Sequence, residues 1–233
     1  MIDLDEWITE LDEEPDQELA DYEAYQKQLF EDYVLRKNDN QEKRKELLKR
    51  YRTGAPLTGE KGLRKELAAF DLGYFGRAYL PHYFVRKSPK FHEELDDIWE
   101  HSVMKSLNPL KSAKEISGEK GSRNVIAAPR GHAKSTNLTF KDDLHATLYV
   151  YKHYILILSD SSDQAEGFLD EIKTELEENA AIIEDFGQLK SDKAWRSNVI
   201  VTKNNVKIEA IGSGKKVRGK KAQELETRSH CFG

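Results

Sequence analysis

The residues from Asn124 to Thr136 carry the clearest chemical signal in this sequence. A short apolar run at 125–128 leads into Pro129-Arg130-Gly131-His132-Ala133-Lys134-Ser135-Thr136, and a helical pattern follows. A strand that ends in a turn and restarts as a helix directs backbone N–H groups and the positive end of the helix dipole at one spot. This suits a triphosphate, with the Lys134 ammonium on the β- and γ-phosphates and the Ser135 hydroxyl on a bound Mg²⁺.

This loop departs from the general phosphate-loop pattern G-x-x-x-x-G-K-[ST]. Ala128 and Ala133 stand where that pattern has glycine, and only Gly131 remains between them. A left-handed alanine costs roughly 1–2 kcal/mol. The loop therefore either avoids that conformation or tolerates the strain for binding. The alternative interpretation is an ordinary helix N-terminus in an α/β sheet, with Ser135 and Thr136 as capping residues.

The composition permits one α/β domain with an appendage, because 233 residues can bury a sizeable core. Apolar residues make up 38% and charged residues 34% of the chain, so much of it must be solvated helix surface. Cys231 is the only cysteine, which excludes a disulfide framework and a thiolate metal cluster. The start at 1–6 is acidic, unlike a signal peptide, and no run approaches a membrane span. We therefore expect a cytoplasmic protein without a membrane partner.

The charge is distributed unevenly along the chain. The net charge of −5 combines an N-terminal stretch of 24 residues that contains no Lys or Arg with a strongly basic run at 215–221. Acidic segments repel nucleic acid and basic segments attract it. Any contact with DNA is expected at 215–221, near the other end of the chain.

The first half of the sequence reads as helical. Apolar residues at loosely helical spacing from Leu4 to about Tyr51 predict two charged helices, with Pro15 as the interruption. They would form either a docking arm for a partner or, as we favour, a solvated helical hairpin. A breaker cluster at 53–59 predicts a boundary near residue 55. The aromatic residues at 70–84 could pack on an adenine face, but such clusters more often fill a core.

The second half alternates between strand and helix patterns. We expect strands at 124–128 and 154–158, helices at 135–149 and 162–178, and a hairpin that joins 199–202 to 206–210. The predicted fold class is α/β, with an incomplete parallel sheet of the P-loop NTPase type flanked by helices and preceded by a helical N-terminal extension. The expected divisions are an extension at 1–55, an aromatic-rich helical lead-in at 56–120 and the incomplete ATPase core at 121–233.

Taken together, these pieces resemble the N-terminal ATPase part of the terminase large subunit of tailed phages, the motor that pumps DNA into a procapsid. The likeness covers about residues 70 to 220. It is carried by these stretches: Phe75-Gly76-Arg77-Ala78-Tyr79-Leu80-Pro81-His82-Tyr83-Phe84, Phe91-His92-Glu93-Glu94-Leu95, Ala128-Pro129-Arg130-Gly131-His132-Ala133-Lys134-Ser135, Ile157-Leu158-Ser159-Asp160-Ser161-Ser162-Asp163-Gln164-Ala165 and Gly212-Ser213-Gly214-Lys215-Lys216-Val217-Arg218-Gly219.

The resemblance implies specific roles for the loop. Lys134 and Arg130 would contact the phosphates of ATP as catalytic cations, and Ser135 would help to hold Mg²⁺. The basic residues near the end would contact DNA or nucleotide: Lys215, Lys216 and Arg218. Implied partners are double-stranded DNA, a small terminase subunit and a portal protein, in the host cytoplasm. Asp160, which follows an apolar strand pattern, is expected to cap the next helix rather than to bind metal.

The sequence after Arg218-Gly219 departs from the family pattern. Terminase large subunits continue with an apolar strand that ends in paired acids, whereas residues 220–233 are polar here and no nuclease domain follows. The resemblance therefore implies an incomplete motor that binds ATP and hydrolyses it poorly. Two alternatives stay open, a helicase-like P-loop ATPase and a non-enzymatic prophage remnant or adaptor that binds a partner through its acidic helices.

Overall fold

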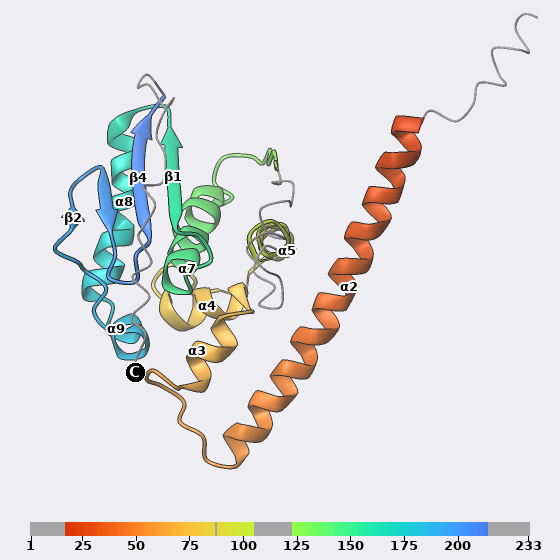
Figure 1. Cartoon of the computed structure of the whole chain (residues 1–233), viewed down its shortest axis with the longest axis horizontal. Helices are drawn as coiled ribbons and strands as arrows, with labels where there is room; N and C mark the ends of the chain where they lie inside the picture. Colours follow the sequence, from red (N-terminus) through yellow and green to blue (C-terminus); the bar gives the residue numbers. More distant parts are fainter. Residues whose placement is uncertain (1–16, 87, 105–122, 214–233) are drawn as a thin grey trace, which may run out of the picture. The chain divides into compact units, whose positions relative to one another are not determined.

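The computed structural model describes residues 17–86, 88–104 and 123–213 (Figure 1). The chain divides into two compact units, Met1–Leu48 and Lys49–Gly233. The basic residues Lys215, Lys216 and Arg218, the polar tail and Cys231 all lie outside the described residues.

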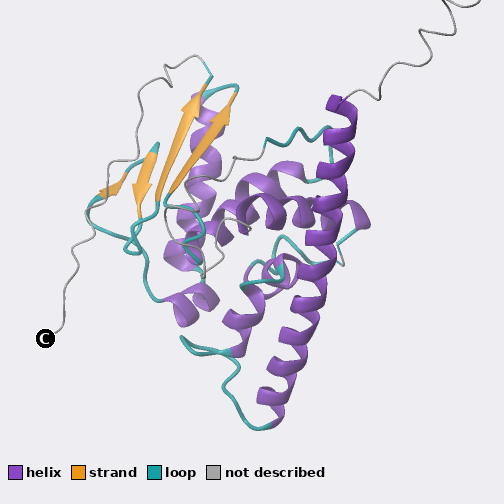
Figure 2. Cartoon of the chain, turned by 45° about the vertical axis from the view of Figure 1, so that its right-hand side comes forward, coloured by secondary structure: helices purple, strands orange, loops and turns teal. Residues whose placement is uncertain are grey.

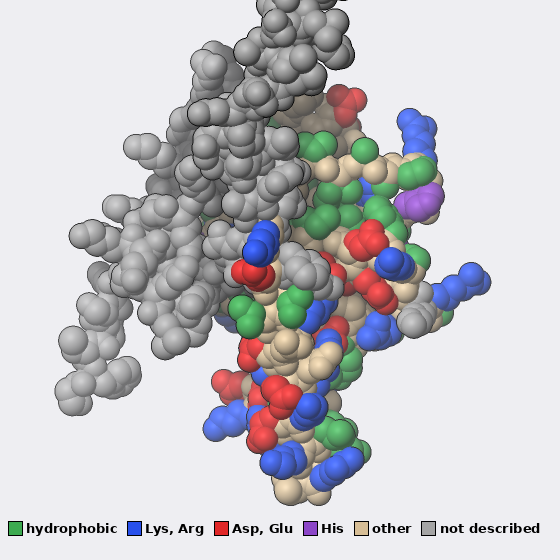
Figure 3. Space-filling view, turned by 90° about the vertical axis from the view of Figure 1, so that its right-hand side faces the viewer, with side chains coloured by type: hydrophobic (Ala, Val, Ile, Leu, Met, Phe, Trp, Pro, Cys, Tyr) green, Lys and Arg blue, Asp and Glu red, His purple; other side chains and the backbone are tan. Residues whose placement is uncertain are grey.

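Helix α2 spans Gln17–Arg52 without a break. No proline or glycine occurs within it, and basic residues in its last turn, Lys49, Arg50 and Arg52, face the negative end of the helix dipole favourably. This confirms the second of the two charged helices, whereas the first lies outside the described residues. Acidic and basic side chains are interspersed over the coloured surface in Figure 3, as solvated helices require.

The larger unit begins with short helices. They are α3 (Leu63–Ala68), α4 (Leu72–Tyr79), α5 (Lys90–Trp99) and the π-helical turn η2 (Glu100–Met104). Asp71 caps α4 by accepting a hydrogen bond of 2.8 Å from the backbone N–H of Tyr74. Phe75 and Tyr79 are fully buried. These two aromatic residues therefore fill a core, as predicted, whereas Tyr83 is 42% exposed.

The helix expected at 135–149 forms, but its first part is unusually wide. Residues Thr136–Lys141 form the π-helical segment η4, and Asp142–Leu148 continue as α7. Every residue from Phe140 to Leu148 is buried. This helix therefore runs through the interior of the unit and fixes the loop that precedes it.

The sheet has four strands in the order β1-β4-β3-β2. They are β1 (Tyr154–Ser159), β2 (Ala194–Trp195), β3 (Val199–Val201) and β4 (Lys207–Gly212). Only β1 and β4 are parallel, and the other two pairs are antiparallel. The sheet is mixed, which corrects the expected parallel sheet, because the short turn between β3 and β4 forces those two strands to be antiparallel.

Two helices follow β1 and lead to the rest of the sheet. The helix predicted at 162–178 is α8 (Ser162–Glu178), and the unpredicted α9 (Ala180–Phe186) comes directly after it. Ser161, not Asp160, caps α8, since the Ser161 side chain accepts from the backbone N–H of Gln164 at 3.2 Å. The expectation for Asp160 was therefore wrong by one residue. Figure 2 shows α8 running along one face of the strands.

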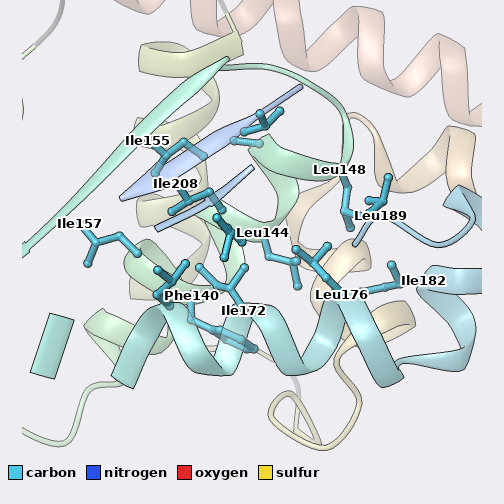
Figure 4. Close-up of a cluster of buried hydrophobic side chains, with 14 of the residues drawn as sticks. Phe140, Leu144, Leu148, Ile155, Ile157, Ile172, Leu176, Ile182, Leu189 and Ile208 are labelled. Atoms are coloured by element: carbon cyan, nitrogen blue, oxygen red, sulfur yellow. The ribbon is translucent and has the colours of Figure 1, made fainter. Parts of the chain in front are cut away.

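The hydrophobic core joins the continuous helix formed by η4 and α7 to the sheet. Figure 4 shows side chains from several helices and strands meeting in one cluster. Phe140 and Leu144 come from η4 and α7, Ile155 from β1, and Ile172 and Leu176 from α8. These side chains are 8% exposed or less. Burial of this size contributes roughly 1.5–3 kcal/mol per side chain, so the position of the helix formed by η4 and α7 is strongly determined.

The strand expected at 124–128 does not form. The segment is extended, but no strand pairs with it among the described residues, and the Val125 side chain is 98% exposed. An apolar run forms a strand only where a neighbour accepts its backbone hydrogen bonds and covers its side chains. Neither condition is met within the described residues, so the loop at 129–136 leads into a helix without following a paired strand.

Candidate phosphate-binding site

The turn that precedes η4 contains two left-handed residues. Gly131 has φ 82° and Ala133 has φ 50°. Gly131 has open space where a side chain would lie, so glycine is favoured by its backbone conformation alone. Ala133 tolerates the left-handed conformation at a cost of roughly 1–2 kcal/mol. The loop therefore keeps the strained backbone that the sequence left as one of two options, and such backbone is typical of anion-binding concavities.

Lys134 folds back over its own loop. Its Nζ donates to the carbonyl oxygen of Ala128 and, at 3.3 Å, to that of Pro129. The side chain is half-buried, while most of the loop around it is exposed. Both acceptors are neutral carbonyl oxygens, and the phosphates of a ligand would be stronger acceptors. The geometry thus places a cation at the centre of the turn.

The first helical residues do not act as ordinary caps. Ser135 has helical dihedrals, φ −65° and ψ −39°, and its side chain makes no capping hydrogen bond. Instead Asn137 binds the Ala133 carbonyl twice, through its backbone N–H and its side-chain Nδ2, each at 3.0 Å. The capping role considered for Ser135 is therefore wrong, and the Ser135 hydroxyl lies at an exposed position beside Lys134.

The remaining loop residues lie at the surface. Pro129, Arg130 and His132 are exposed. His132 lies edge-on to the Phe91 ring, with centroids 6.1 Å apart and planes at 87°. Arg130, Lys134 and Ser135 share one short turn because they are close in sequence, whereas the basic residues Lys215, Lys216 and Arg218 lie outside the described residues.

Helix α5 supports the loop, a role that the sequence did not reveal. His92 Nε2 lies 3.0 Å from the His132 carbonyl oxygen. One turn further along α5, Asp96 contacts Lys141 of η4. The spacing of four residues indicates that His92 and Asp96 share a helix face. The spacing does not say which part of the protein this face contacts. The supporting roles of His92 and Asp96 could therefore not be predicted from the sequence.

A pocket of about 290 Å³ adjoins the loop. Its lining includes Tyr83, Phe84, Arg86, His92, Ala133 and Thr136. The walls combine apolar and aromatic side chains with the polar groups of Arg86, His92 and Thr136, a mixture that small-molecule sites use. Tyr83 is 42% exposed, unlike the buried aromatic residues of α4, so part of the aromatic cluster faces this pocket.

The core behind the loop is rich in buried carboxyl groups. Burial raises the pKa of Asp142 to about 7, against the opposing attraction of Lys141. Burial likewise raises the pKa of Asp96 and, more strongly, that of Asp143. His145 on the same helix is buried, and its pKa is lowered to about 3. Lys141 forms ion pairs with Asp96 and Asp142.

A second polar cluster joins the linker to α9. Asp185 accepts from Arg64 Nε at 2.7 Å, from the Gly59 backbone N–H at 2.6 Å and from the Tyr79 hydroxyl. Burial alone would raise the pKa of Asp185, but the hydrogen bonds from Arg64 and Tyr79 lower it below its usual value. These contacts join the segment before α3, at Gly59, and α3 itself, at Arg64, to α9.

No family model, no curated protein and no solved structure matches this chain. Within the described ranges, His, Cys, Asp and Glu side chains do not gather into groups of three or more that could hold a metal ion. None of the helices in the described part of the chain combines the length and apolar character needed to cross a bilayer.

Proposed function

We propose that this chain binds a nucleoside triphosphate with Mg²⁺ through residues 129–136, as the ATPase part of a DNA-packaging motor that resembles a terminase large subunit. One observation carries the proposal. Left-handed residues at Gly131 and Ala133 shape a turn, Lys134 lies across it, and a helix begins directly after it. Backbone concavity, fixed cation and helix N-terminus are the recurring parts of a phosphate site.

The ligand would reorganise the contacts of Lys134. The Nζ would leave the carbonyl oxygens of Ala128 and Pro129 for phosphate oxygens, which are charged and hence stronger acceptors. Arg130 is exposed one residue before Gly131 and would supply the second cation. The exposed Ser135 hydroxyl would contact a Mg²⁺ that arrives with the triphosphate, because Mg²⁺ is commonly held by phosphates together with few protein ligands.

The adjoining pocket gives this nucleotide a place for its nucleoside part. It lies between the segment Tyr83–Arg86 and the start of η4, so it meets the phosphate loop at Ala133 and Thr136. Tyr83 and Phe84 supply aromatic surface for a base, and Arg86 supplies a cation. The binding of a base there is part of the proposal.

The motor role is proposed from the sequence resemblance. It includes ATP hydrolysis that is weak in this chain, contact with double-stranded DNA through Lys215, Lys216 and Arg218, and assembly with a small subunit and a portal protein in the host cytoplasm. Fixed cations stabilise charge on a transferred phosphoryl group, but hydrolysis also needs a positioned water. The described residues support nucleotide binding more directly than turnover.

Titration calorimetry of the purified chain with Mg²⁺·ATP tests the proposal. The Lys134→Ala variant is expected to bind at least about tenfold more weakly, because a charged hydrogen bond contributes about 1.5–3 kcal/mol. Lys203→Ala is the matched control, since Lys203 is exposed at the turn between β3 and β4. Equal affinity in the wild type and the Lys134→Ala variant, or no binding at all, would rule out the loop and favour the adaptor alternative.

A further inference from the structure

We propose that His92 is a positioning residue that holds the phosphate loop in its binding conformation. This inference rests on the proposed function, because it concerns how the same loop is prepared for a triphosphate. His92 belongs to α5, which lies outside the loop in sequence and contributes no residue to the phosphate-binding pattern.

The contact itself defines the direction of a hydrogen bond. His92 Nε2 lies 3.0 Å from the carbonyl oxygen of His132. A carbonyl oxygen can only accept, so Nε2 must carry the hydrogen, whether the ring is neutral or charged. His92 is half-buried and the His132 side chain is exposed. The bond therefore fixes the His132 backbone and leaves its side chain unconstrained by this contact.

The bonded peptide lies between the two left-handed residues. Gly131 precedes His132 and Ala133 follows it. The peptide that joins His132 to Ala133 is planar and trans, so its C=O and the N–H of Ala133 point in opposite directions. Holding the carbonyl toward His92 therefore turns the Ala133 N–H away from α5. In a loop that binds through backbone amides, one donor is thereby oriented before the ligand arrives.

Helix α5 is itself anchored to the helix that follows the loop. Asp96, one turn after His92, contacts Lys141, and the two residues are 6% and 2% exposed. Lys141 also donates to Asn137 Oδ1 at 3.2 Å, and Asn137 binds the Ala133 carbonyl. His92 and Asp96 thus hold both ends of the segment from His132 to Lys141. Because α5 is anchored in this way, the single hydrogen bond from His92 can hold the loop in one geometry.

His92 also lines the adjoining pocket, so a direct contact with the nucleoside is the competing explanation. Two probes separate the explanations. Mg²⁺·ATP has a nucleoside, whereas Mg²⁺·tripolyphosphate has phosphates alone. A residue that orients the loop affects both probes, and a residue that contacts the base affects only ATP.

The experiment compares binding of both probes by the wild type and by His92→Ala, His92→Gln and Glu94→Ala. We expect His92→Ala to weaken both probes by about three- to tenfold, the loss of one hydrogen bond. His92→Gln should restore binding, because its amide N–H can donate from a similar position. Glu94 is an exposed residue on α5 and its variant should bind like the wild type.

Thermal unfolding without ligand separates positioning from general damage. We expect similar melting temperatures for the wild type, His92→Ala and His92→Gln, because the contact is half-buried and local. The inference is overturned if His92→Ala weakens binding of ATP but not of tripolyphosphate, or if it binds both probes like the wild type. Either result leaves the proposed function intact. If the wild type binds neither probe, the proposed function itself fails, and this inference fails with it.

Discussion

Lys141 donates a hydrogen bond to Asp96 in the interior of the protein, and this contact joins the helix after the loop at 129–136 to α5. Both side chains are nearly inaccessible, at 2% and 9% exposure. Asp142 Oδ1 lies 3.4 Å from the same Nζ. The buried Lys141 ammonium thus contacts two carboxyl groups beside the candidate site. Its removal would leave buried negative charge without a partner.

Lys141→Met is therefore expected to destabilise the fold by about 3–5 kcal/mol, the usual cost of removing one partner of a buried pair. The free energy of unfolding, measured in urea, tests this. The double variant Lys141→Met/Asp96→Asn should recover part of the loss, because the orphaned charge is gone. Lys190→Met is the control, since Lys190 pairs with Glu177 at the surface and 50% of its side chain is exposed. A loss below 1 kcal/mol for Lys141→Met would contradict the prediction.

The raised pKa of Asp142 predicts how stability depends on pH. Burial raises this pKa from 3.8 to about 7, so the folded state holds a proton that the unfolded state releases above pH 4. Stability from this group is complete below about pH 4 and is lost as the pH rises toward 7. The charged groups that act on it are Lys141, Asp96 and Glu100.

The Asp142→Asn variant should remove this dependence. It is expected to be more stable than the wild type at pH 8, by up to about 4 kcal/mol, and to differ little at pH 4. Urea unfolding at both values measures the difference. A variant that is less stable than the wild type at pH 8 would show that the carboxylate is ionised and favourably bound in the fold. Asp163→Asn, at an exposed position in α8, should change stability little at either pH.

The Arg64–Asp185 pair predicts the opposite response to acid. Hydrogen bonds from Arg64 and Tyr79 outweigh burial and lower the pKa of Asp185. Its contribution is therefore present above the unfolded pKa of about 4 and is lost as the pH falls through the lower folded value. Asp185→Asn should destabilise the fold by about 3 kcal/mol at pH 7 and by progressively less under acid conditions.

The neighbouring Glu184 is the matched control for that change. It also binds Arg64, at 2.8 Å, but 49% of its side chain is exposed, and Glu184→Gln should cost much less stability than Asp185→Asn. Urea unfolding at pH 7 compares the two variants. Equal losses would mean that burial does not decide the strength of these contacts.

The left-handed backbone of Ala133 predicts that replacing this residue by glycine stabilises the fold. Its φ of 50° is costly for alanine and free for glycine, so Ala133→Gly should stabilise the fold by about 1 kcal/mol, less the extra entropy of glycine in the unfolded chain. Gly131→Ala, at φ 82°, is the converse variant and should lose stability. Thermal unfolding of both variants tests the pair. Destabilisation by Ala133→Gly would show that the left-handed backbone carries no strain.

Local pattern alone predicted the elements that depend on neighbours along the chain. The helical spacing in α2 and α8, the apolar run of β1 and the turn between β3 and β4 each encode their own structure, because helix and hairpin preferences act over a few residues. The turn and helix start at 129–136 were predicted for the same reason, whereas the phosphate binding inferred from those residue types stays a prediction. The short elements β2 and α9 were missed because they carry too few residues to show a period.

Tertiary structure decided everything that depends on residues meeting across the chain. The run at 125–128 has the composition of a strand, yet none of the four strands in the described part of the chain pairs with it. The approach of His92 to His132 and of Asp96 to Lys141 depends on how α5 packs, which no spacing records. The pKa of Asp142 depends on burial from several directions at once. The sequence by itself predicted a phosphate-binding loop at 129–136, which stays a prediction, and packing alone determined that His92 contacts this loop and that Asp96 contacts the helix after it.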